Sequence, residues 1–371
     1  MSKETPQITT ILTTYRRPMY LRRAIMSVLK QTYRNVRVLV LDDASNDETE
    51  QVVHALATED SRVQYVRHER NIGMTPNWRF GLEHVETPYF SFLSDDDLHL
   101  PGFYLSAFKE LEGNRAVDFY CGATIMFDTQ GNISGVSTHG WTEGVYHPYD
   151  GMLKMMQEPP NWDGVLFRKA VFEKIGTLSN IHATDYEFLV RAARRCSFVV
   201  THEPCAMFQY HAGRQAWKPA INSKSQELFH ESVQLASDLL GAKELPPEVR
   251  AAAWPVMNAQ VLSAGKYLFL TRVITRQAQE ALEVAHYLRR LSPGSFKAYK
   301  FVVLAVVLRR FPAVSSWIHS RLLKPKPLRG RQQRQWQACY GRWTFYASQL
   351  LPRGDSADSS AGGRPRSASR P

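Results

Sequence analysis

Three acidic clusters, each beside an apolar run, are the residues of this chain best suited to chemistry. They are LVLDDASND at residues 39–47, FLSDDDLHLP at 92–101 and ATDYEFLVRAARR at 183–195. Carboxylates held a few ångströms apart repel one another, so clustering them is costly unless a cation balances their charge. A divalent metal ion that holds a diphosphate is the usual occupant of such a cluster. The first two clusters therefore predict a site for a metal ion and a phosphorylated ligand.

The elements that must position these clusters alternate between strand and helix. Runs of β-branched and apolar residues predict buried strands at 7–14, 36–41, 63–66 and 89–93. Amphipathic patterns and helix-start residues predict helices between and after them, at 18–30, 47–58, 75–85 and 101–113. This alternation predicts a mostly parallel, doubly wound α/β sheet. Ligands bind at the carboxyl ends of the strands in such sheets, where the first two clusters lie.

The second part of the chain has a looser pattern that becomes wholly helical. Short strands are expected at 118–127, 144–146, 165–167, 197–201 and 207–210. A helix is expected at 184–196, with Thr184 as a candidate N-cap, and helices dominate from about residue 220 onward. The sequence after Leu351 is of low complexity, so we expect a disordered tail at 352–371.

Charge is distributed unevenly along the chain, whose formal net charge is +11. Residues 1–218 carry 23 Lys and Arg against 26 Asp and Glu, whereas residues 219–371 carry 23 against 9. No acidic residue lies between Val284 and Gly354, a stretch with 14 basic residues. Such asymmetry indicates an anionic partner for the basic part, either a membrane surface or nucleic acid.

Cysteine spacing and the N-terminal sequence bear on the location of the protein. The four cysteines form no CxxC pair, which argues against a disulfide framework or a zinc site. The first apolar run, at 8–13, is short and has no basic segment before it, so no secretory signal is expected. A reducing cytoplasm fits both observations, with the inner face of the cell membrane as the location if the basic part binds lipid.

The ordered motifs of the first part of the chain resemble those of a known family. Residues 8–49 read ITTILTTYRRPMYLRRAIMSVLKQTYRNVRVLVLDDASNDET, similar to the opening of family 2 inverting glycosyltransferases of the GT-A fold. The family motifs are a T-x-Y-x-R turn, a helix ending in S-x-x-x-Q-T/S-Y, and D-D-x-S-x-D after the next strand. They are matched by Thr13, Tyr15, Arg17, Ser27, Gln31, Thr32, Tyr33, Asp42, Asp43, Ser45 and Asp47. The resemblance covers roughly residues 7–215 and implies a Rossmann-like, doubly wound mixed sheet, to which the chain adds a helical basic C-terminal extension.

The resemblance implies a nucleotide-sugar donor, most simply a UDP-sugar, bound beside the first two strands. Tyr15 can stack on a nucleobase. A carboxylate after the second strand can accept the imide N–H of uracil, a role that the resemblance gives to Asp43. Arg17 can pair with phosphate, and the resemblance also places Thr13 and Asp95 at the nucleotide. The alternative for Asp43 is that it only caps the helix that follows.

Residues 94–97 (SDDD) stand where the family carries its D-x-D metal motif. Counting back from Pro101, Asp96 and the acid after it match the last two acids of that motif, and Ser94 replaces the first. The resemblance implies that Asp96 is a metal ligand and that His211 reaches the metal ion or the diphosphate. Hard oxygen ligands favour Mg²⁺ or Mn²⁺ over zinc. The alternatives are a solvated acidic loop for the aspartates and a structural role for the histidine.

Asp185 matches the acid of the family's E-D motif, the general base, with Thr184 in place of the Glu. Inverting transfer needs one base to take the proton of the acceptor hydroxyl, and a carboxylate at the rigid start of a helix can do so. The alternative is a first-turn Asp that the helix dipole favours. Trp162 and Asp163 stand where the family builds its acceptor wall, although core packing suits this Trp equally well. Residues 75–79 stand where the family has a segment beside the phosphates, so Arg79 is a further candidate for phosphate contact.

Two segments of the basic extension suit a membrane surface. The run FVVLAVVL at 301–308 is bracketed by basic residues and is too short to cross a bilayer, which needs about 20 residues. An apolar run with basic flanks suits an interfacial helix. A second segment, 329–346, places Trp, Tyr and Phe among arginines, a composition that favours the headgroup layer and anionic lipid. The alternative is a helical hairpin that packs on the catalytic domain with a solvated basic face.

We therefore expect a catalytic domain at 1–218, a helical basic extension at 219–351 and the tail at 352–371. The expected function is metal-dependent, inverting transfer of a sugar from a nucleotide-sugar to a hydroxyl of a glycan or lipid-linked acceptor, in cell-surface polysaccharide assembly as the resemblance implies. A nucleotidyltransferase is one alternative, but it needs a Gly-rich phosphate loop after the first strand, and TTYRRP has no Gly. A nucleic-acid-binding protein is another, but it leaves the acidic clusters unexplained.

Overall fold

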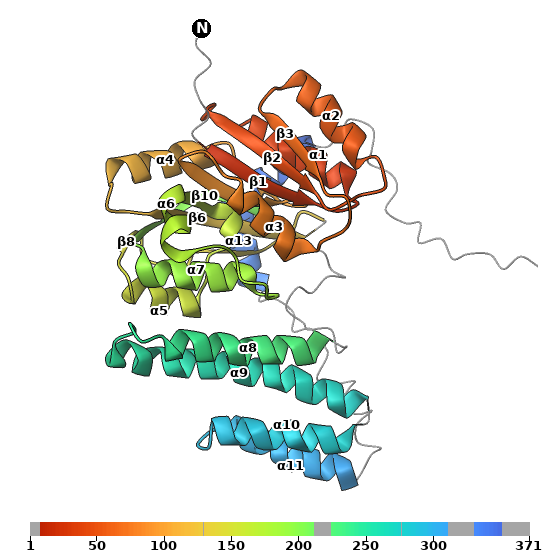
Figure 1. The fold of residues 1–371 in the computed structure, drawn as a ribbon, viewed down its shortest axis with the longest axis vertical. Coiled ribbons are helices and arrows are strands. Elements are labelled where there is room, and N and C mark those ends of the chain that lie inside the picture. Colours follow the sequence, from red (N-terminus) through yellow and green to blue (C-terminus); the bar gives the residue numbers. More distant parts are fainter. Residues whose placement is uncertain (1–7, 129, 211–223, 276, 311–329, 351–371) are drawn as a thin grey trace, which may run out of the picture.

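A ten-stranded mixed sheet forms the upper half of the molecule in Figure 1. The computed structural model describes residues 8–128, 130–210, 224–275, 277–310 and 330–350. The strand order is β3-β2-β1-β4-β9-β6-β10-β5, with β7 beside β6 and β8 beside β10. The strands β3, β2, β1 and β4 are mutually parallel, whereas β9 is antiparallel to both β4 and β6. The sheet is therefore parallel on one side and mixed on the other.

The parallel side follows the predicted alternation of strand and helix to within a few residues. Strand β1 lies between β2 and β4 and is buried along its whole length. Its β-branched and leucine side chains point to both faces of the sheet, as expected for a strand that is covered on both sides. The elements are β1 (Ile8–Thr14), α1 (Pro18–Leu29), β2 (Val36–Asp42), α2 (Thr49–Glu59), β3 (Val63–Arg67), α3 (Met74–Glu83), β4 (Tyr89–Ser94) and α4 (Phe103–Gly113).

The mixed side differs more from expectation. The expected strands at 197–201 and 207–210 form one strand, β10, whose pairing with β6 shifts register on either side of Pro204. A proline has no N–H to give to the ladder, so an irregularity at that point lets a single strand continue past it. The elements are β5 (Leu98–His99), β6 (Phe119–Asp128), β7 (Ile133–Val136), β8 (Gly144–Tyr146), α5 (Asp150–Gln157), η1 (Trp162–Gly164), β9 (Val165–Arg168), α6 (Lys169–Ile175), α7 (Thr184–Arg195) and β10 (Phe198–Tyr210).

Two helical pairs lie below the sheet, one beneath the other (Figure 1). The upper pair is α8 (Lys224–Gly241) and α9 (Pro247–Ile274), and the lower pair is α10 (Ala278–Leu291) and α11 (Phe296–Arg310). The upper pair shares a hydrophobic core with α5 and α7, and Gln260 of α9 donates to the hydroxyl of Tyr186 in α7 across 2.7 Å. The core of the sheet therefore continues across the predicted boundary between residues 218 and 219.

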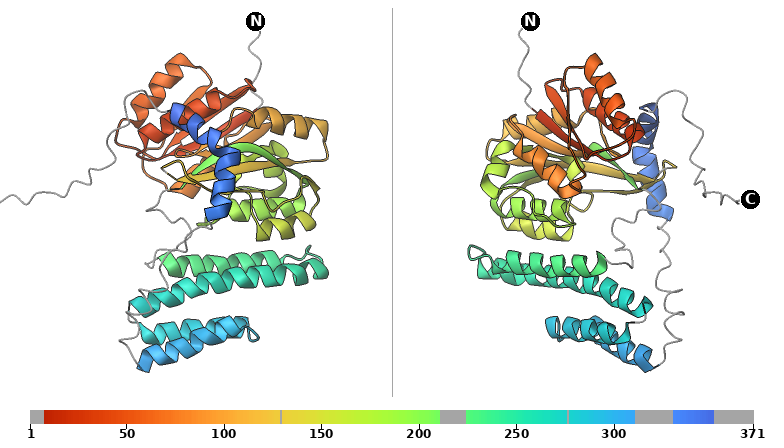
Figure 2. Two further views of the ribbon diagram at one scale, coloured as in Figure 1. Left: turned by 180° about the vertical axis from the view of Figure 1, so that it is seen from behind. Right: turned by 45° about the vertical axis from the view of Figure 1, so that its right-hand side comes forward.

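The last described helix, α13 (Gly330–Gln349), returns to the sheet and packs along its mixed side (Figure 2). Trp336, Tyr340, Trp343 and Tyr346 pack in a cluster with Ile133 and other apolar residues of the sheet. Only Phe345 among the aromatic residues of this helix is strongly exposed. Of the segment 329–346, the structure describes residues 330–346 and gives most of their aromatic surface the packed arrangement, not the membrane-facing one.

Other expectations concern the membrane and the C-terminal tail. None of the helices within the described ranges is both long and apolar enough to cross a bilayer. The tail at 352–371 lies outside the described residues.

Candidate functional site

The carboxyl ends of β1, β2 and β4 lie level with one another at one edge of the sheet. Thr14 of β1 is in register with Asp42 of β2, and Thr13 is in register with Ser94 of β4. Because the three strands are parallel, the residues that follow each of them emerge side by side. The first two acidic clusters and the T-x-Y-x-R turn are therefore brought together, as the sequence predicts.

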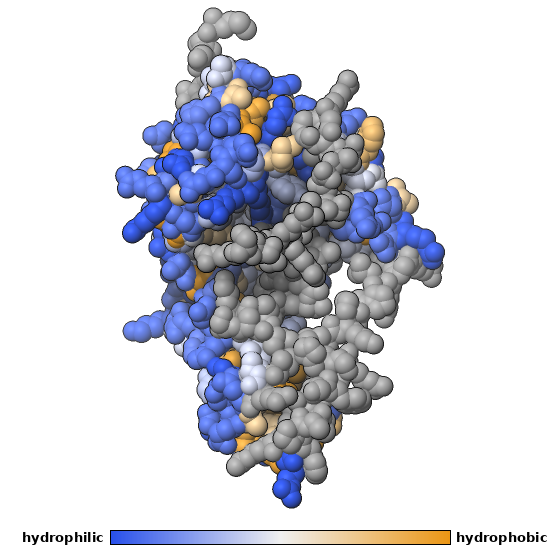
Figure 3. Space-filling view, turned by 90° about the vertical axis from the view of Figure 1, so that its right-hand side faces the viewer, coloured by the Kyte–Doolittle hydropathy of each residue, from blue (hydrophilic) through white to orange (hydrophobic). Residues whose placement is uncertain are grey.

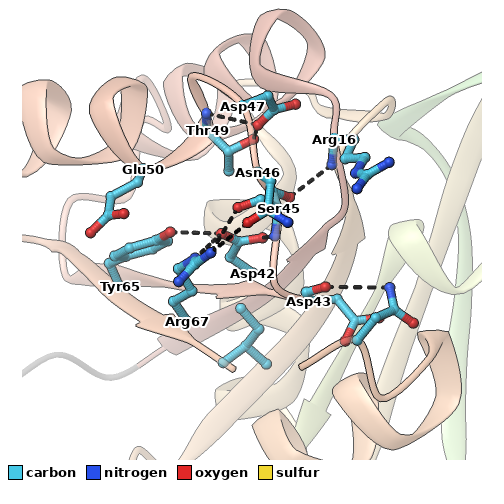
Figure 4. A network of polar contacts seen from close by, with 12 residues as sticks. Arg16, Asp42, Asp43, Ser45, Asn46, Asp47, Thr49, Glu50, Tyr65 and Arg67 are labelled. Carbon is cyan, nitrogen blue, oxygen red and sulfur yellow. Dashed lines mark hydrogen bonds and ion pairs between the residues drawn. The ribbon is translucent and has the colours of Figure 1, made fainter. Parts of the chain in front are cut away.

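Asp42 is a structural residue of this edge (Figure 4). Its buried carboxylate accepts hydrogen bonds from the backbone N–H of Ser45 at 2.9 Å and from the hydroxyl of Tyr65 at 2.7 Å. Arg67 approaches the same carboxylate at 3.7 Å. These contacts fix the loop after β2, so Asp42 orients its neighbour Asp43 instead of facing a ligand.

Asp43 is almost fully buried and holds the loop that precedes α3. Its two carboxylate oxygens accept the backbone N–H groups of Ile72 at 2.6 Å and Gly73 at 3.0 Å. Gly73 has a φ of +91°, in a region of backbone space that glycine adopts without strain. Each carboxylate oxygen has a second lone pair, so Asp43 can still accept an N–H from a nucleobase. Its role at the base stays a prediction.

The turn after β1 is held in an uncommon backbone conformation. Arg16 and Ala44, in facing loops, have φ values of +57° and +61°, which few residues other than glycine adopt. The N–H of Arg16 donates to the hydroxyl of Ser45 across 2.8 Å and ties the two loops together (Figure 4). Tyr15 is 40% exposed beside them. The guanidinium of Arg16 lies over its ring at 5.0 Å from the ring centre, so the remaining exposed part of the ring is the surface on which a nucleobase could stack.

Arg17 lies against the acidic run that follows β4. Its guanidinium contacts Asp95 at 2.9 Å and Asp96 at 2.6 Å, and the hydroxyl of Thr14 donates to Asp95 across 2.8 Å. Burial raises the pKa of Asp95 to about 6, against the lowering effect of Arg17. The arginine expected at a phosphate therefore balances the charge of two carboxylates in this structure.

The residues around the acidic run fit a divalent ion that a ligand helps to hold. In the described ranges, no group of three or more His, Cys, Asp or Glu side chains is arranged to bind a metal by itself. Mg²⁺ is usually held by one or two carboxylates together with substrate phosphates and water. Asp95 and Asp96 supply two such carboxylates, and the guanidinium between them shows that a cation is accommodated there. The second predicted ligand, His211, lies outside the described residues.

A second carboxyl pair, which no sequence pattern predicts, lies beneath the acidic run. Asp97 and Asp163 are each 1% exposed, and burial raises the pKa of both. Asp97 accepts the N–H of Gln209 at 2.7 Å, whereas its second oxygen and one oxygen of Asp163 receive no N–H or hydroxyl from the described residues, so these two carboxyl groups can share a proton with each other. The charges of Asp96 and Asp185 also raise the pKa of Asp163. The acids of the second and third clusters therefore converge around it.

Trp162 and Asp163, expected at the acceptor wall, lie in the core below the site. Trp162 is 8% exposed and stacks on Phe92 with ring centroids 4.3 Å apart. It also meets Trp78 edge to face at 5.0 Å. Aromatic neighbours take up the faces of this ring, and Asp163 is buried beside it. Packing, which the sequence left as the alternative for Trp162, is its role in the structure.

Asp185 stands in the first turn of α7 and is exposed to solvent. Neighbouring protein atoms exclude part of the water around the carboxyl, and this desolvation raises its pKa above the ordinary value for Asp. Thr184 does not cap the helix as expected, because its hydroxyl donates to the carbonyl of Ser179 across 2.9 Å and Ala183 occupies the N-cap position. An accessible carboxylate of raised pKa at a rigid helix start is suited to accept a proton.

The loop that leads into α7 is braced from two sides. Arg79 of α3 donates two hydrogen bonds to the carbonyl of Leu178, at 2.7 and 3.0 Å, so it supports this loop instead of reaching toward a phosphate. Glu231 of α8 accepts the backbone N–H of His182 at 3.0 Å and lies 2.9 Å from its ring nitrogen Nδ1. The helical region therefore takes part in positioning Asp185, a connection that no local sequence pattern reveals.

Comparison with known proteins identifies the family. The model of the family described as glycosyl transferase family 2 matches residues 9–176. An uncharacterized glycosyltransferase of Rickettsia prowazekii is 34% identical over 223 residues, which are 58% of this chain and 68% of that protein. The chain belongs to glycosyltransferase family 2.

Solved structures confirm the expected GT-A fold of this family 2 member. TarS of S. aureus in complex with UDP-GlcNAc matches with a TM-score of 0.59 and 16% identity, over 82% of this chain and 91% of that one. The mannosyltransferase PcManGT of Pyrobaculum calidifontis, in complex with GDP-Man and Mn²⁺, matches with a TM-score of 0.50 and 15% identity, over 85% and 84%. At these identities the likeness concerns the fold alone.

Several curated relatives of this family 2 member are matched over part of their length. The GalNAc(5)-diNAcBac-PP-undecaprenol β-1,3-glucosyltransferase of Campylobacter jejuni is 28% identical over 130 residues, which are 35% of this chain and 41% of that enzyme. The chain likewise spans 45% and 37% of the length of uncharacterized glycosyltransferases from Methanocaldococcus jannaschii and Rickettsia typhi.

Proposed function

We propose that this family 2 member is an inverting glycosyltransferase that moves a sugar from a nucleotide-sugar, most simply a UDP-sugar, to a hydroxyl of a glycan or lipid-linked acceptor. The observation that carries the proposal is the contact of Arg17 with Asp95 and Asp96, beside Tyr15 and Asp43 at one sheet edge. This edge combines an open aromatic ring, a carboxylate for a base edge, and a cation-binding carboxylate pair.

The donor is proposed to bind along the ends of β1, β2 and β4. Tyr15 stacks on the base, and Asp43 accepts its N–H while remaining fixed by the loop before α3. Thr13 and Asp95 are proposed to contact the nucleotide, and Arg17 to pair with its phosphates. The complex of TarS with UDP-GlcNAc, on the same fold, supports a uridine donor.

Asp95 and Asp96 are proposed to hold Mn²⁺ or Mg²⁺ together with the donor's diphosphate. When bound, such an ion supplies positive charge that stabilises the departing diphosphate. The Mn²⁺ in the complex of the Pyrobaculum mannosyltransferase supports a divalent ion at this fold. The protein's own part is to fix the carboxylate of Asp95, which the hydroxyl of Thr14 does.

Asp185 is proposed to take the proton of the acceptor hydroxyl as that oxygen attacks the anomeric carbon. The proton moves to the carboxylate of Asp185, the bond to the diphosphate breaks, and a single displacement of this kind inverts the configuration. The raised pKa makes this carboxylate a stronger base than an ordinary Asp, and its exposure leaves it accessible to an acceptor. The loop contacts of Arg79 and Glu231 hold it in place.

The acceptor is proposed to be a glycan or a lipid-linked sugar used in cell-surface polysaccharide assembly. The Campylobacter relative is a glucosyltransferase named for an undecaprenol-linked glycan, which supports a lipid-linked acceptor. The strongly basic C-terminal half supports a location in the cytoplasm at the inner, anionic face of the cell membrane. Nucleic acid is not proposed as a partner, because nucleic-acid binding would leave the acidic clusters at the site unexplained.

Thermal unfolding with a panel of nucleotides, with and without Mn²⁺, tests the proposal. We expect UDP to raise the Tm in the presence of Mn²⁺ and to have little effect in chelator. The variant Asp96→Ala should lose the dependence on Mn²⁺, whereas Asp238→Ala, an exposed charge change on α8, should keep it. Equal UDP affinity in chelator and in Mn²⁺ would remove the metal assignment, and the absence of a shift with every nucleotide would contradict the function itself.

A further inference from the structure

Helix α11 exposes an apolar stripe at the end of the molecule farthest from the sheet (Figure 1). Its members recur three or four residues apart, which places them on one face of the helix. The opposite face packs inward through Ala298 and Ala305, which are 0% and 1% exposed. The stripe consists of Phe296, Tyr299, Val303, Val306 and Val307, which are 70, 49, 45, 53 and 38% exposed.

Basic side chains accompany the stripe on its own face and at its edge. Lys300 and Arg310 are exposed on the same face of α11, and Lys300 lies 4.7 Å from the ring centre of Phe296. Arg289, at the end of α10, lies 5.5 Å from the ring centre of Tyr299. Long cationic side chains that lie along aromatic rings keep their charged ends beside an apolar surface. The face is therefore both apolar and cationic.

Acidic side chains of the lower helical pair point elsewhere. Helix α11 has no Asp or Glu, and none occurs in the sequence from 284 to 354. Glu280 and Glu283 of α10 line an open surface pocket of about 590 Å³ between α10, α8 and α9. The negative charge of α10 therefore lies on the side of α10 that faces α8 and α9, and the stripe has no acidic neighbour on its own helix.

We propose that the apolar stripe of α11 docks on an anionic bilayer and lies in the headgroup region parallel to the membrane plane. Monomeric proteins rarely expose contiguous apolar patches without a partner. An interfacial helix buries apolar side chains at the acyl boundary while its cations contact lipid phosphates, and this stripe offers both features. The space-filling view shows hydrophobic side chains among hydrophilic ones at this end of the molecule (Figure 3).

The inference rests on the proposed use of a lipid-linked acceptor and names the surface that meets the membrane. That surface is α11 and not α13, because the sheet already covers most aromatic residues of α13. The stripe, at the end of the molecule opposite the sheet, makes the helical pairs a spacer between bilayer and catalytic site. A helix of 15 residues is long enough to lie in the interface and too short to span it.

Vesicle sedimentation of the full chain tests the proposal without donor or acceptor, so it does not depend on catalysis. We expect the protein to pellet with vesicles of phosphatidylcholine and phosphatidylglycerol at low salt, and to stay in solution with phosphatidylcholine alone or with free inorganic phosphate. The double variant Val303→Glu/Val306→Glu should lower the bound fraction about ten-fold or more. The milder Val303→Ser/Val306→Ser should lower it less, and both should keep the wild-type Tm because these positions are exposed.

Phe345→Glu and the single variant Val306→Glu form a matched pair with the double variant, because each places one negative charge at an exposed apolar position, and Phe345→Glu, on α13, is the control. It should pellet like the wild type. Equal loss in this control, or unchanged pelleting of the Val303→Glu/Val306→Glu variant, would overturn the assignment to α11. No pelleting of the wild type would overturn membrane docking, while retained UDP binding in the same preparation would leave the proposed enzyme function standing. A wild-type dimer in light scattering that the double variant dissociates would identify a second copy as the occupant instead.

Discussion

The guanidinium of Arg17 lies 2.6 Å from the carboxylate of Asp96. The same group reaches Asp95 at 2.9 Å, so a cation of the protein itself occupies the place between the two carboxylates proposed to bind a metal ion. Arg17 and a divalent ion therefore compete for the same oxygens. If the ion displaces it, the guanidinium becomes available to the phosphates of the donor.

The variant Arg17→Gln should bind Mn²⁺ more tightly than the wild type when no nucleotide is present. The reason is that the competing ion pair is gone, and a partly exposed pair is worth about 1 kcal/mol, or about five-fold in affinity. With Mn²⁺ present, the same variant should bind UDP more weakly, because it lacks a phosphate partner. Titration calorimetry with Mn²⁺ alone and then with UDP measures both effects.

Arg16→Gln is the control for this pair of measurements. It removes one positive charge from the same loop, but its side chain lies over the ring of Tyr15 and not against the acidic run. It should leave the affinity for Mn²⁺ near that of the wild type. If Arg17→Gln weakens Mn²⁺ binding, the arginine supports the carboxylates and does not compete with the ion.

Asp185→Asn should keep donor binding and lose sugar transfer. The amide has nearly the same shape as the carboxylate but cannot take the proton of the acceptor hydroxyl, so we expect a fall in kcat of about 10²-fold or more. Turnover with a lipid-linked or glycan acceptor and the Kd for UDP in Mn²⁺ provide the two readouts. Transfer at a near wild-type rate would mean that another residue is the base.

Glu187→Gln serves as the neighbouring control on the same helix. Glu187 pairs with Arg191 at 2.6 Å and faces into the protein, so its role is structural. We expect this change to lower the Tm while most of the transfer activity remains. A loss of transfer as large as that of Asp185→Asn, at an unchanged Tm, would move the catalytic assignment to Glu187.

Glu231→Ala should lower kcat without changing the Kd for UDP. Glu231 of α8 holds His182, three residues before the proposed base, through two contacts of 3.0 and 2.9 Å. Small displacements of a catalytic group can cost a large factor in rate, so a fall of about ten-fold is expected. Glu231→Gln, which can still accept one hydrogen bond, should recover part of the rate.

The control for this prediction is Asp238→Ala, an exposed position on the same helix. It should leave kcat unchanged. If Glu231→Ala leaves kcat as in the wild type, α8 does not position the base. The same conclusion holds if the fall in kcat is accompanied by a large fall in Tm, because the loss of activity then reflects a less stable fold. The measurement also bears on the predicted boundary at 218, since a catalytic contact across it would make α8 part of the working enzyme.

The sequence was sufficient to predict the parallel side of the sheet and the edge where the site lies. Strands β1, β2 and β4 are runs of mostly apolar and β-branched residues, and α1 begins at Pro18, a residue typical of a helix start. Strand ends can be located from the sequence, so the positions of Tyr15, Asp43 and Asp95 at one edge followed from local pattern and topology alone.

Contacts between distant segments were not predictable in this way. Arg79 reaches a backbone carbonyl at Leu178 because α3 packs beside the loop before α7, which no pattern near Arg79 encodes. The aromatic segment of α13 has the composition of a helix that lies at a membrane surface, yet it packs against the sheet. Composition describes what a surface can bind, whereas the fold decides which partner is near enough to bind it.

The pairing of Asp97 with Asp163 is a contact of the same kind, and it leads to a test of stability. Both carboxyls are buried, and burial raises the pKa of each in the folded state. Between the ordinary carboxyl range and the raised values, the folded protein therefore binds more protons than the unfolded chain. The free energy of unfolding contributed by this pair falls as pH rises through that window, and the full penalty is present above it.

Asp163→Asn should raise the free energy of unfolding, and the gain should be larger at about pH 8 than at about pH 5. The amide removes one of two buried charges and can donate to the oxygen of Asp97 that receives no N–H or hydroxyl from the described residues, a combined effect of about 1–3 kcal/mol. Urea unfolding at the two pH values measures it, and sugar transfer by the variant shows whether Asp163 contacts the acceptor. A variant that is less stable than the wild type at both pH values would mean that the shared proton of the pair stabilises the fold.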